Sequence, residues 1–254
     1  MILDSFRLDG KVAVVTGSTR GLGQDAAVAF AEAGADVALI DRSVASETAQ
    51  RITDLGRRVL PIQLDLGQAT ASQMDAAIQS VVDALGRVDI LVNNAGMIRR
   101  APLLDHQAAD WDAVLALNLD AVFHLSQAAA RRFAAQGSGK IINVASMLSF
   151  QGGVFVPGYT ASKHAVAGIT KAFANELAAH GVNVNAIAPG YMATDNTAQI
   201  RADEARQQAI LDRIPAGRWG TPADLQGPFV FLASPASDYL NGAIIPVDGG
   251  WLVR

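Results

Sequence analysis

The sequence predicts one α/β domain built on a doubly wound, parallel β-sheet of about seven strands. Short runs rich in β-branched residues alternate with alanine-rich segments of helical periodicity. The strand-like runs are apolar throughout, as is typical of strands that helices cover on both faces. No low-complexity linker or internal repeat divides residues 1–254, so we expect a single domain.

The predicted elements follow one another in a regular order. Seven strands are expected at residues 11–16, 36–40, 58–64, 88–93, 140–145, 182–188 and 243–247. The clearest helices between them are expected at residues 22–34, 43–55, 69–85 and 160–179. Right-handed crossovers through such helices give a doubly wound sheet. The stretch 189–242 lacks a strand, and we expect it to carry helices and a substrate flap at about residues 191–216.

Composition narrows the classes of function. With 50% apolar and 17% charged residues the chain is globular, and its net charge of −4 disfavours nucleic-acid binding. The absence of cysteine excludes disulfides and thiolate nucleophiles, and the four histidines lack metal-ligand spacing, so we expect no metal. The sequence shows neither a signal-peptide pattern nor an apolar run of about 18 residues, so we expect a soluble, cytoplasmic protein without a membrane partner.

The glycine-rich segment TGSTRGLG lies between the first predicted strand and the first predicted helix. Its glycines let the backbone turn tightly and approach a pyrophosphate, which the helix N-terminus stabilises. The spacing alone is a weak signal, and a plain strand–helix turn is the alternative. Its position favours a dinucleotide site of the Rossmann type. The predicted cofactor contacts in this segment are Gly17, Arg20, Gly21, Leu22 and Gly23.

Asp41 ends the second predicted strand, 24 residues after Gly17. A carboxylate at this place accepts hydrogen bonds from the adenosine ribose hydroxyls and repels a 2′-phosphate. A helix N-cap is an equally common role for a lone aspartate, and the nearby Arg20 and Arg42 could instead bind a 2′-phosphate. We predict NAD as the cofactor.

Three further segments follow strand ends: QLDL after the third strand, NNAG after the fourth and APGYMATD after the sixth. The first could contact adenine, the second could bring backbone close to the ribose, and the third could wall the nicotinamide and hold its carboxamide or a phosphate. Each segment alone is more typical of a turn, and only their common edge of the sheet favours binding. The predicted contacts are Asp65, Leu66, Asn93, Ala95, Gly96, Pro189, Gly190 and Thr194.

The segment NVASMLSFQGGVFVPGYTASK, residues 143–163, carries a serine, a tyrosine and a lysine. Tyr159 and Lys163 are one helical turn apart on the inward face of a predicted helix, where an unpaired lysine is rare. A phenol is a poor base at neutral pH, and a semi-buried ammonium would lower its pKa. Ser146 could hydrogen-bond the substrate oxygen. A structural tyrosine beside a solvent-reaching lysine is the alternative.

In order along the whole chain, TGSTRGLG, NNAG, Asn118, Ser146, Tyr159-x-x-x-Lys163 and PGYMAT resemble the short-chain dehydrogenase/reductase family. The resemblance implies a catalytic tetrad of Asn118, Ser146, Tyr159 and Lys163. In it Tyr159 transfers a proton, Lys163 tunes its pKa and binds the cofactor ribose, and the main-chain carbonyl of Asn118 holds a relay water. The resemblance also implies a homotetramer, and the apolar tail GGWLVR is its local hint.

Stretches outside those motifs resemble the subgroup of 2-deoxy-D-gluconate 3-dehydrogenases, which implies an alcohol–ketone interconversion on a deoxy sugar acid in uronate and pectin breakdown. The stretches are MILDSF, NNAGMIRR, KIINVASMLSFQGG, NAIAPGYMATDNT, IRADEAR, ILDRIPAGRWG and VDGGWLVR. A gluconate 5-dehydrogenase is one alternative. A 3-oxoacyl-carrier-protein reductase is another, although its acidic partner prefers a basic patch. A dinucleotide-binding sensor is the non-enzymatic alternative, and it needs neither Tyr159 nor Lys163.

A sugar acid carries a carboxylate that an apolar pocket cannot hold without a cationic partner. The tandem Arg99-Arg100 comes three residues after Gly96, just past a strand end on the predicted cofactor edge. We expect one of the two to bind the carboxylate and Gln151 to add a neutral donor. Solvated loop arginines, or a pair with Asp105, are the alternative.

Overall fold

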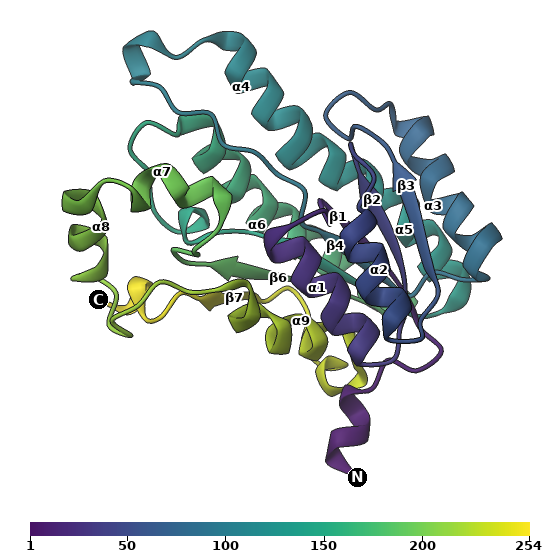
Figure 1. Ribbon diagram of the computed structural model, residues 1–254. Helices are drawn as coiled ribbons and strands as arrows, with labels where there is room; N and C mark the ends of the chain where they lie inside the picture. The colour runs from purple at the N-terminus through teal and green to yellow at the C-terminus, as the bar shows by residue number, and fades with distance from the viewer.

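A seven-stranded, all-parallel sheet forms the centre of the computed structural model, which describes residues 1–254 (Figure 1). The strand order is β3-β2-β1-β4-β5-β6-β7, so the order reverses between β1 and β4. Helices cover both faces, and the predicted doubly wound α/β fold is confirmed. The strands are β1 (Val12–Thr16), β2 (Asp36–Asp41), β3 (Val59–Gln63), β4 (Ile90–Asn93), β5 (Gly139–Val144), β6 (Val182–Pro189) and β7 (Ile244–Val247).

Nine α-helices surround the sheet. They are α1 (Gly21–Glu32), α2 (Ser46–Asp54), α3 (Ala71–Leu85), α4 (Ala108–Leu115), α5 (Ala121–Gln136), α6 (Pro157–Leu177), α7 (Ala198–Arg201), α8 (Glu204–Leu211) and α9 (Gln226–Ala233). Local signals set the ends of several: α3 begins after a Thr70–Gln73 capping box and ends at Gly86, which has φ +91°. Helix α6 begins three residues before the predicted start because Pro157 suits the first turn of a helix.

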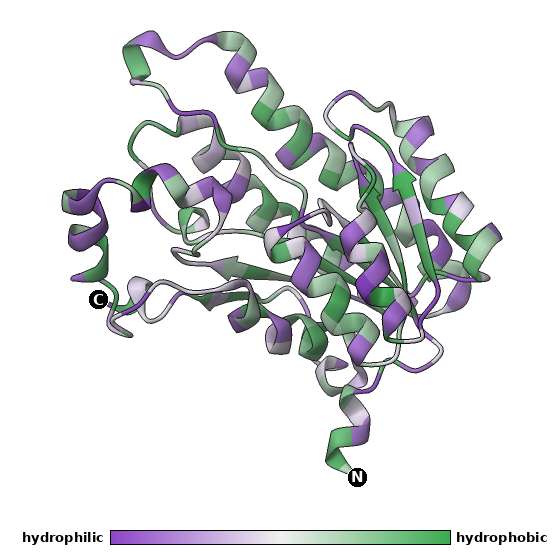
Figure 2. Ribbon diagram, viewed as in Figure 1, coloured by the Kyte–Doolittle hydropathy of each residue, from purple (hydrophilic) through white to green (hydrophobic).

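Alternate residues of β1 show how the sheet is buried from both sides. Ala13 and Val15 pack with α1, α2 and α9 in one apolar cluster. Val12 and Val14 pack with α3, α5 and α6 in a second cluster on the other face. Figure 2 accordingly shows hydrophobic strands at the centre and polar residues on the outer faces of the helices. This arrangement explains why the strands read as continuous apolar runs.

Helices α4 and α5 form one helical run, Ala108–Gln136, joined by a π-helical turn at Ala116–Asp120. By length and composition the run is long and apolar enough to cross a membrane, although Asn118, Asp120 and His124 interrupt it, so it is not one continuous apolar stretch. Half of its most apolar window is nevertheless buried inside the protein, and core helices of soluble proteins share these properties. The run packs against α3 and α6, so here it serves the core.

The stretch after β6 contains no strand, as predicted, and carries α7, α8 and α9. The two ends of its first part are joined by backbone hydrogen bonds. Gly220 N donates to Tyr191 O at 2.9 Å, and Ala193 N donates to Gly220 O at 2.7 Å. We call residues 191–216 the flap segment. Figure 1 shows its helices α7 and α8 beyond the carboxyl ends of β6 and β7.

Candidate active site

The carboxyl edge of the sheet brings the predicted residues together. Gly17 follows β1, Asp41 ends β2, Asn93 ends β4, Ser146 follows β5 and Pro189 ends β6. Because parallel strands all end at the same edge, residues up to 172 positions apart in the chain meet there, as expected of this fold.

The glycines of the TGSTRGLG loop have two different roles. A Cβ on Gly17 would lie 2.8 Å from Ala95 Cα, and one on Gly23 would lie 2.2 Å from Gly17 O, so both glycines permit close backbone packing. Gly21 has φ +61°, and a Cβ there would meet only Thr194 Cγ2, at 3.9 Å. The N-terminus of α1 is therefore open at Gly21, and helix N-termini favour anionic groups such as phosphates.

The carboxylate of Asp41 accepts hydrogen bonds from the same loop. One of its carboxylate oxygens accepts from Thr19 N at 3.0 Å and from Thr19 Oγ1 at 2.5 Å, and the other accepts from Arg42 N at 2.8 Å. The Arg20 guanidinium forms an ion pair with Asp195 of the flap segment at 2.8 Å, whereas the Arg42 side chain is exposed and has no ion-pair partner. The loop therefore presents a carboxylate, and one of its two arginines is engaged elsewhere.

The side chains of the NNAG segment are engaged within the protein, and its backbone contact with the ribose stays a prediction. The Asn93 side chain is buried beneath the edge and donates to Ser126 Oγ at 2.9 Å and to Asn143 Oδ1 at 2.8 Å, so it faces the core and not a ligand. Asn94, which the sequence analysis did not single out, donates to Thr16 O and Gly17 O at 2.9 Å each. The sequence signal for a role of Asn94 was its position within the NNAG motif. Asn94 thus fastens this segment to the glycine-rich loop.

Further predicted cofactor contacts lie after β3 and at the end of β6. Asp65 is exposed and accepts from Gly67 N at 3.0 Å in a local turn, and the Leu66 side chain is buried in the core. A Cβ on Gly190 would lie 2.6 Å from Asp248 Cα, so this glycine allows β6 to pack against the C-terminal turn. Pro189 directly precedes Gly190 at the end of β6, and Thr194 follows Gly190 four residues later in the chain.

Tyr159 and Lys163 lie on the first turns of α6, and Lys163 is only 4% exposed. The Lys163 ammonium donates to Val144 O at 2.6 Å and lies 5.5 Å from the centroid of the Tyr159 ring. Burial lowers the pKa of Lys163 to about 8. The predicted inward position of the lysine is therefore confirmed.

The pKa of the tyrosine is shifted in the direction opposite to the one expected. Burial raises the pKa of the Tyr159 phenol, while Ser146 and the charge of Arg100 act in the opposite direction. Lys163 is not among the groups that lower this pKa here, because its ammonium is bound to the Val144 carbonyl and lies 5.5 Å from the ring centroid. Tyr159 is consequently protonated at neutral pH and suited to donate a proton.

Ser146 is held at the edge by its own turn. Its Oγ accepts from Leu148 N at 3.1 Å, and the residue is 7% exposed. Three positions after Leu148 comes the partly exposed Gln151, whose side chain makes no hydrogen bond within the protein. Ser149 Oγ donates to Lys163 O at 2.6 Å and so ties the serine loop to α6.

Asn118 is fully buried within the π-helical turn, a feature often found at functional sites. Its side chain accepts from Met97 N at 2.9 Å and donates to Met97 O at 3.0 Å and to Ser162 Oγ at 3.2 Å. Sequence reasoning did not foresee these contacts. They join the chain after NNAG to the residue beside Lys163, while the relay role of the Asn118 carbonyl stays a prediction.

The structure distinguishes the two candidate arginines. Arg99 Nε lies 3.4 Å from Asp110 Oδ1 on α4, and neither arginine pairs with Asp105. Arg100 Nη2 donates to Asn196 O of the flap segment at 3.2 Å, and its charge acts on the Tyr159 phenol. Of the two arginines, Arg100 is therefore the one whose charge acts on the Tyr159 phenol.

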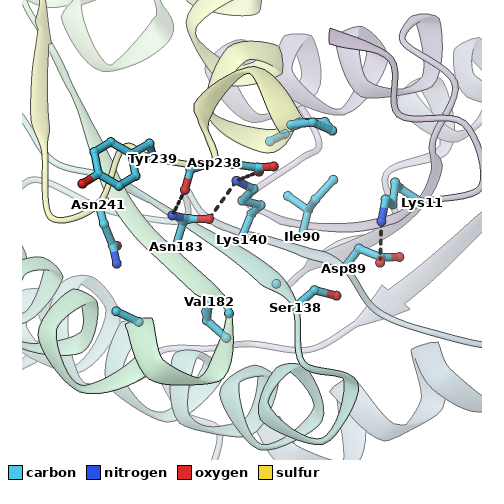
Figure 3. Close-up of a pocket in the computed structure, with 15 residues that line it drawn as sticks. Lys11, Asp89, Ile90, Ser138, Lys140, Val182, Asn183, Asp238, Tyr239 and Asn241 are labelled. Atoms are coloured by element: carbon cyan, nitrogen blue, oxygen red, sulfur yellow. Dashed lines mark hydrogen bonds and ion pairs between the residues drawn. The ribbon is translucent and has the colours of Figure 1, made fainter. Parts of the chain in front are cut away.

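A cavity of about 620 Å³ lies at the opposite, amino edge of the sheet (Figure 3). Its lysines are engaged: Lys140 Nζ donates to Asp238 Oδ1 at 2.7 Å and to Asn183 Oδ1 at 2.8 Å, and Lys11 Nζ lies 3.5 Å from Asp89 Oδ1. Helices α5 and α6 end at this edge, and helix C-termini carry partial negative charge. These cations offset helix ends and carboxylates, and none of the predicted site residues lines the cavity.

Comparison with known proteins agrees with this geometry. The family profile described as short chain dehydrogenase matches residues 11–205. The 2-dehydro-3-deoxy-D-gluconate 5-dehydrogenase of Escherichia coli is 58% identical over 100% of both chains, and the enzyme of that name from Bacillus subtilis is 53% identical over 99% of this chain and 98% of its own.

Among solved structures, a putative 2-deoxy-D-gluconate 3-dehydrogenase from Agrobacterium tumefaciens with bound NADP is 52% identical, with a TM-score of 0.91 over 98% of this chain and 99% of the other. Fold, edge residues and full-length similarity lead to one conclusion. This chain belongs to the short-chain dehydrogenase family and is an NAD(P)-dependent oxidoreductase.

Proposed function

We propose that this protein is a dehydrogenase of 2-dehydro-3-deoxy-D-gluconate that interconverts a hydroxyl and a ketone at C5. The observation that carries the proposal is the identity of 58% and 53%, over nearly whole chains, to two enzymes of that name. The resemblance in sequence alone suggested oxidation at C3, and the Agrobacterium tumefaciens protein bears such a name. The two more similar relatives favour C5.

The chemistry follows from the edge residues. A bound nicotinamide cofactor supplies or accepts the hydride. In the direction of reduction, the protonated Tyr159 donates its phenol proton to the developing alkoxide, and Ser146 Oγ donates a hydrogen bond to the same oxygen. The raised pKa of Tyr159 suits this direction at neutral pH. Lys163, at 5.5 Å from the phenol ring, stabilises the negative charge left on Tyr159.

Arg100 is the proposed partner of the substrate carboxylate. Its charge acts on the Tyr159 phenol, and its only hydrogen bond, to Asn196 O, leaves other guanidinium donors free. A guanidinium binds a carboxylate in a bidentate manner, so it fixes the orientation of the sugar acid as well as its charge. Gln151 remains a candidate for a neutral contact.

NAD remains the proposed cofactor because Asp41 places a carboxylate beside the glycine-rich loop, where a 2′-phosphate would meet a like charge. Arg20, one of the two possible phosphate partners, is paired with Asp195. The bound NADP in the Agrobacterium tumefaciens structure supports the opposite choice for that relative. The two cofactors therefore need a direct comparison on this enzyme.

We also propose a cytoplasmic homotetramer. The tail does not provide the support expected of it, because Trp251 is 5% exposed and packs within its own chain, leaving Val253 uncovered. Support comes instead from Leu103, Leu104 and Val154, large apolar side chains that are all at least 70% exposed. Light scattering at micromolar concentration tests this, and a monomeric mass contradicts it.

The function is tested by following NADH or NADPH absorbance with 2-dehydro-3-deoxy-D-gluconate, 2-deoxy-D-gluconate and D-gluconate as separate substrates. We expect the highest kcat/KM with the first compound, and NMR of the product should place the new ketone at C5. A preference for 2-deoxy-D-gluconate with a ketone at C3 would overturn the position. A preference for D-gluconate would overturn the substrate.

A further inference from the structure

Tyr191 stands immediately after Gly190 at the end of β6, on the same edge as the catalytic residues. Its ring meets Trp219 edge-on, with centroids 5.2 Å apart and planes at 70°. It meets Trp251 in the same way, at 4.8 Å and 68°. Edge-to-face pairs of this kind are directional, so the two indoles fix the plane of the tyrosine.

Trp251 reaches this position through a rigid C-terminal turn. Gly249 and Gly250 have φ values of +64° and +91°, which other residues rarely adopt. The Asp248 carboxylate accepts from Gly250 N and Leu252 N at 2.9 Å each. The guanidinium of Arg213, from the flap segment, lies 4.0 Å from the centroid of the Trp251 ring.

The same apolar cluster reaches the catalytic loop. Met147 and Leu148, which directly follow Ser146, pack in it together with Tyr191, Trp219 and Trp251. The C-terminal tail, the flap segment and the serine loop therefore share one packed unit. A displacement of the tail moves Tyr191 relative to Ser146.

The phenol of Tyr191 has a free hydroxyl. It makes no hydrogen bond within the chain, and the residue is only partly buried. Arg100, Arg206 and Arg213 are its charged neighbours, and their charges oppose the rise in its pKa that burial causes. Arg100 acts on the phenols of both Tyr159 and Tyr191. A free donor among cations, on the reacting edge, is suited to an anionic oxygen.

We propose that Tyr191 is a specificity-determining residue whose hydroxyl donates a hydrogen bond to the carboxylate of the substrate, and that Trp251 is the residue that positions it. The inference rests on the proposed sugar-acid function, in which Arg100 binds the same carboxylate. The tail then contributes to substrate recognition without touching the substrate.

Tyr191→Phe removes the hydroxyl and keeps the ring. We expect KM for 2-dehydro-3-deoxy-D-gluconate to rise about tenfold or more, consistent with the loss of a hydrogen bond to a charged group, while kcat and the Kd of the cofactor stay within about twofold. Tyr239→Phe, at an exposed tyrosine beside the opposite cavity, is the matched control and should equal wild type. An unchanged KM in Tyr191→Phe overturns the inference.

A double-mutant cycle tests the positioning role. Trp251→Ala should raise KM about as much as Tyr191→Phe does, but should add less than about twofold to KM in the Tyr191→Phe background. Trp251→Phe retains an edge contact and should restore most of the lost affinity. Additive effects, or a Trp251→Phe enzyme as impaired as Trp251→Ala, would overturn the positioning role.

These outcomes are distinct from failure of the proposed function. A wild-type enzyme that turns over no sugar acid overturns the function and with it the carboxylate as the ligand of Tyr191. A wild-type enzyme that turns over 2-dehydro-3-deoxy-D-gluconate, beside a Tyr191→Phe enzyme with the same KM, overturns only the inference.

Discussion

The two halves of the carboxyl edge are held together in different ways. On the side of β1 and β4, backbone groups pack too closely for a Cβ at Gly17 or Gly23. The loops there are also held by the Asn94 amide, which donates to Thr16 O, and by the Asp41 carboxylate, which accepts from Thr19 N. On the side of β6, the flap segment depends on aromatic packing around Tyr191 and on exposed polar contacts. Side chains in the second half can therefore be exchanged without the backbone clashes that a Cβ would cause in the first.

The largest effect is expected where the two halves meet. Tyr159→Phe removes the phenol proton and leaves the contacts that hold the two halves unchanged. Turnover should therefore fall about 10³-fold while NADH binds as in wild type. Steady-state rates and a fluorescence titration of NADH measure the two quantities. Substantial residual turnover would exclude Tyr159 as the proton donor.

On the flap side, Arg100→Ala should raise KM for the sugar acid by about ten- to a hundredfold, because a charge-assisted contact is lost. Arg99→Ala is its matched control, since Arg99 is directed to Asp110 and should leave KM near wild type. Initial rates over a range of substrate concentrations give both values. If Arg99→Ala is the more impaired, the carboxylate is bound on the side of α4.

The buried Lys163 supports both halves, and its removal should separate activity from stability. Its folded pKa of about 8 lies below its ordinary value of 10.5, so the unfolded chain binds more protons between these pH values and stability rises with pH across that range. Lys163→Met should therefore be inactive and yet about 1–2 kcal/mol more stable than wild type at pH 7.

That difference in stability should shrink as the pH rises above 8 and vanish above pH 10.5, where the lysine becomes neutral in the unfolded state as well. Urea unfolding at several pH values measures it. A Lys163→Met protein less stable than wild type at pH 7 would show that the bond to Val144 O outweighs the burial of the charge. Cofactor affinity should also fall if the lysine binds the ribose.

On the rigid side, Asp41→Ala should narrow the preference for NAD over NADP by about tenfold, since a like charge near the 2′-phosphate is removed. The ratio of kcat/KM for the two cofactors measures this. Thr19→Ala is a useful control, because it loosens the same loop without changing its charge. A wild-type enzyme that already prefers NADP would contradict the role of Asp41.

The smallest effect is expected at the link between the halves. The Arg20–Asp195 pair is exposed, with both side chains about two-thirds accessible or more, and exposed pairs contribute little. Asp195→Ala should change KM of the cofactor by less than about threefold, and less still at high salt. A larger, salt-sensitive change would mean that the flap segment is fastened to the cofactor loop more firmly than its contacts indicate.

Local patterns predicted the fold well. All seven strands appear within two residues of their expected bounds, because apolar runs bounded by turn residues leave little choice of register. Helical periodicity also placed Lys163 inward. The tetrad residues lie at one edge, while their roles in the reaction stay predictions.

The sequence could not reveal what depends on distant contacts. The inward turn of Asn93 and the packing of Tyr191 with Trp251 join segments that no periodicity relates. The pKa of Tyr159 was mispredicted because the burial of its phenol is set by the surrounding fold, whereas the spacing to Lys163 shows only a neighbour.

The chain has three tryptophans, and two of them, Trp219 and Trp251, flank Tyr191 beside the flap segment. The third, Trp111, lies on α4 outside this cluster. In a Trp111→Phe background the intrinsic emission therefore comes from the substrate side alone. The protein contains its own optical reporter, so stopped-flow fluorescence can follow the order in which cofactor and sugar acid arrive without attaching a dye.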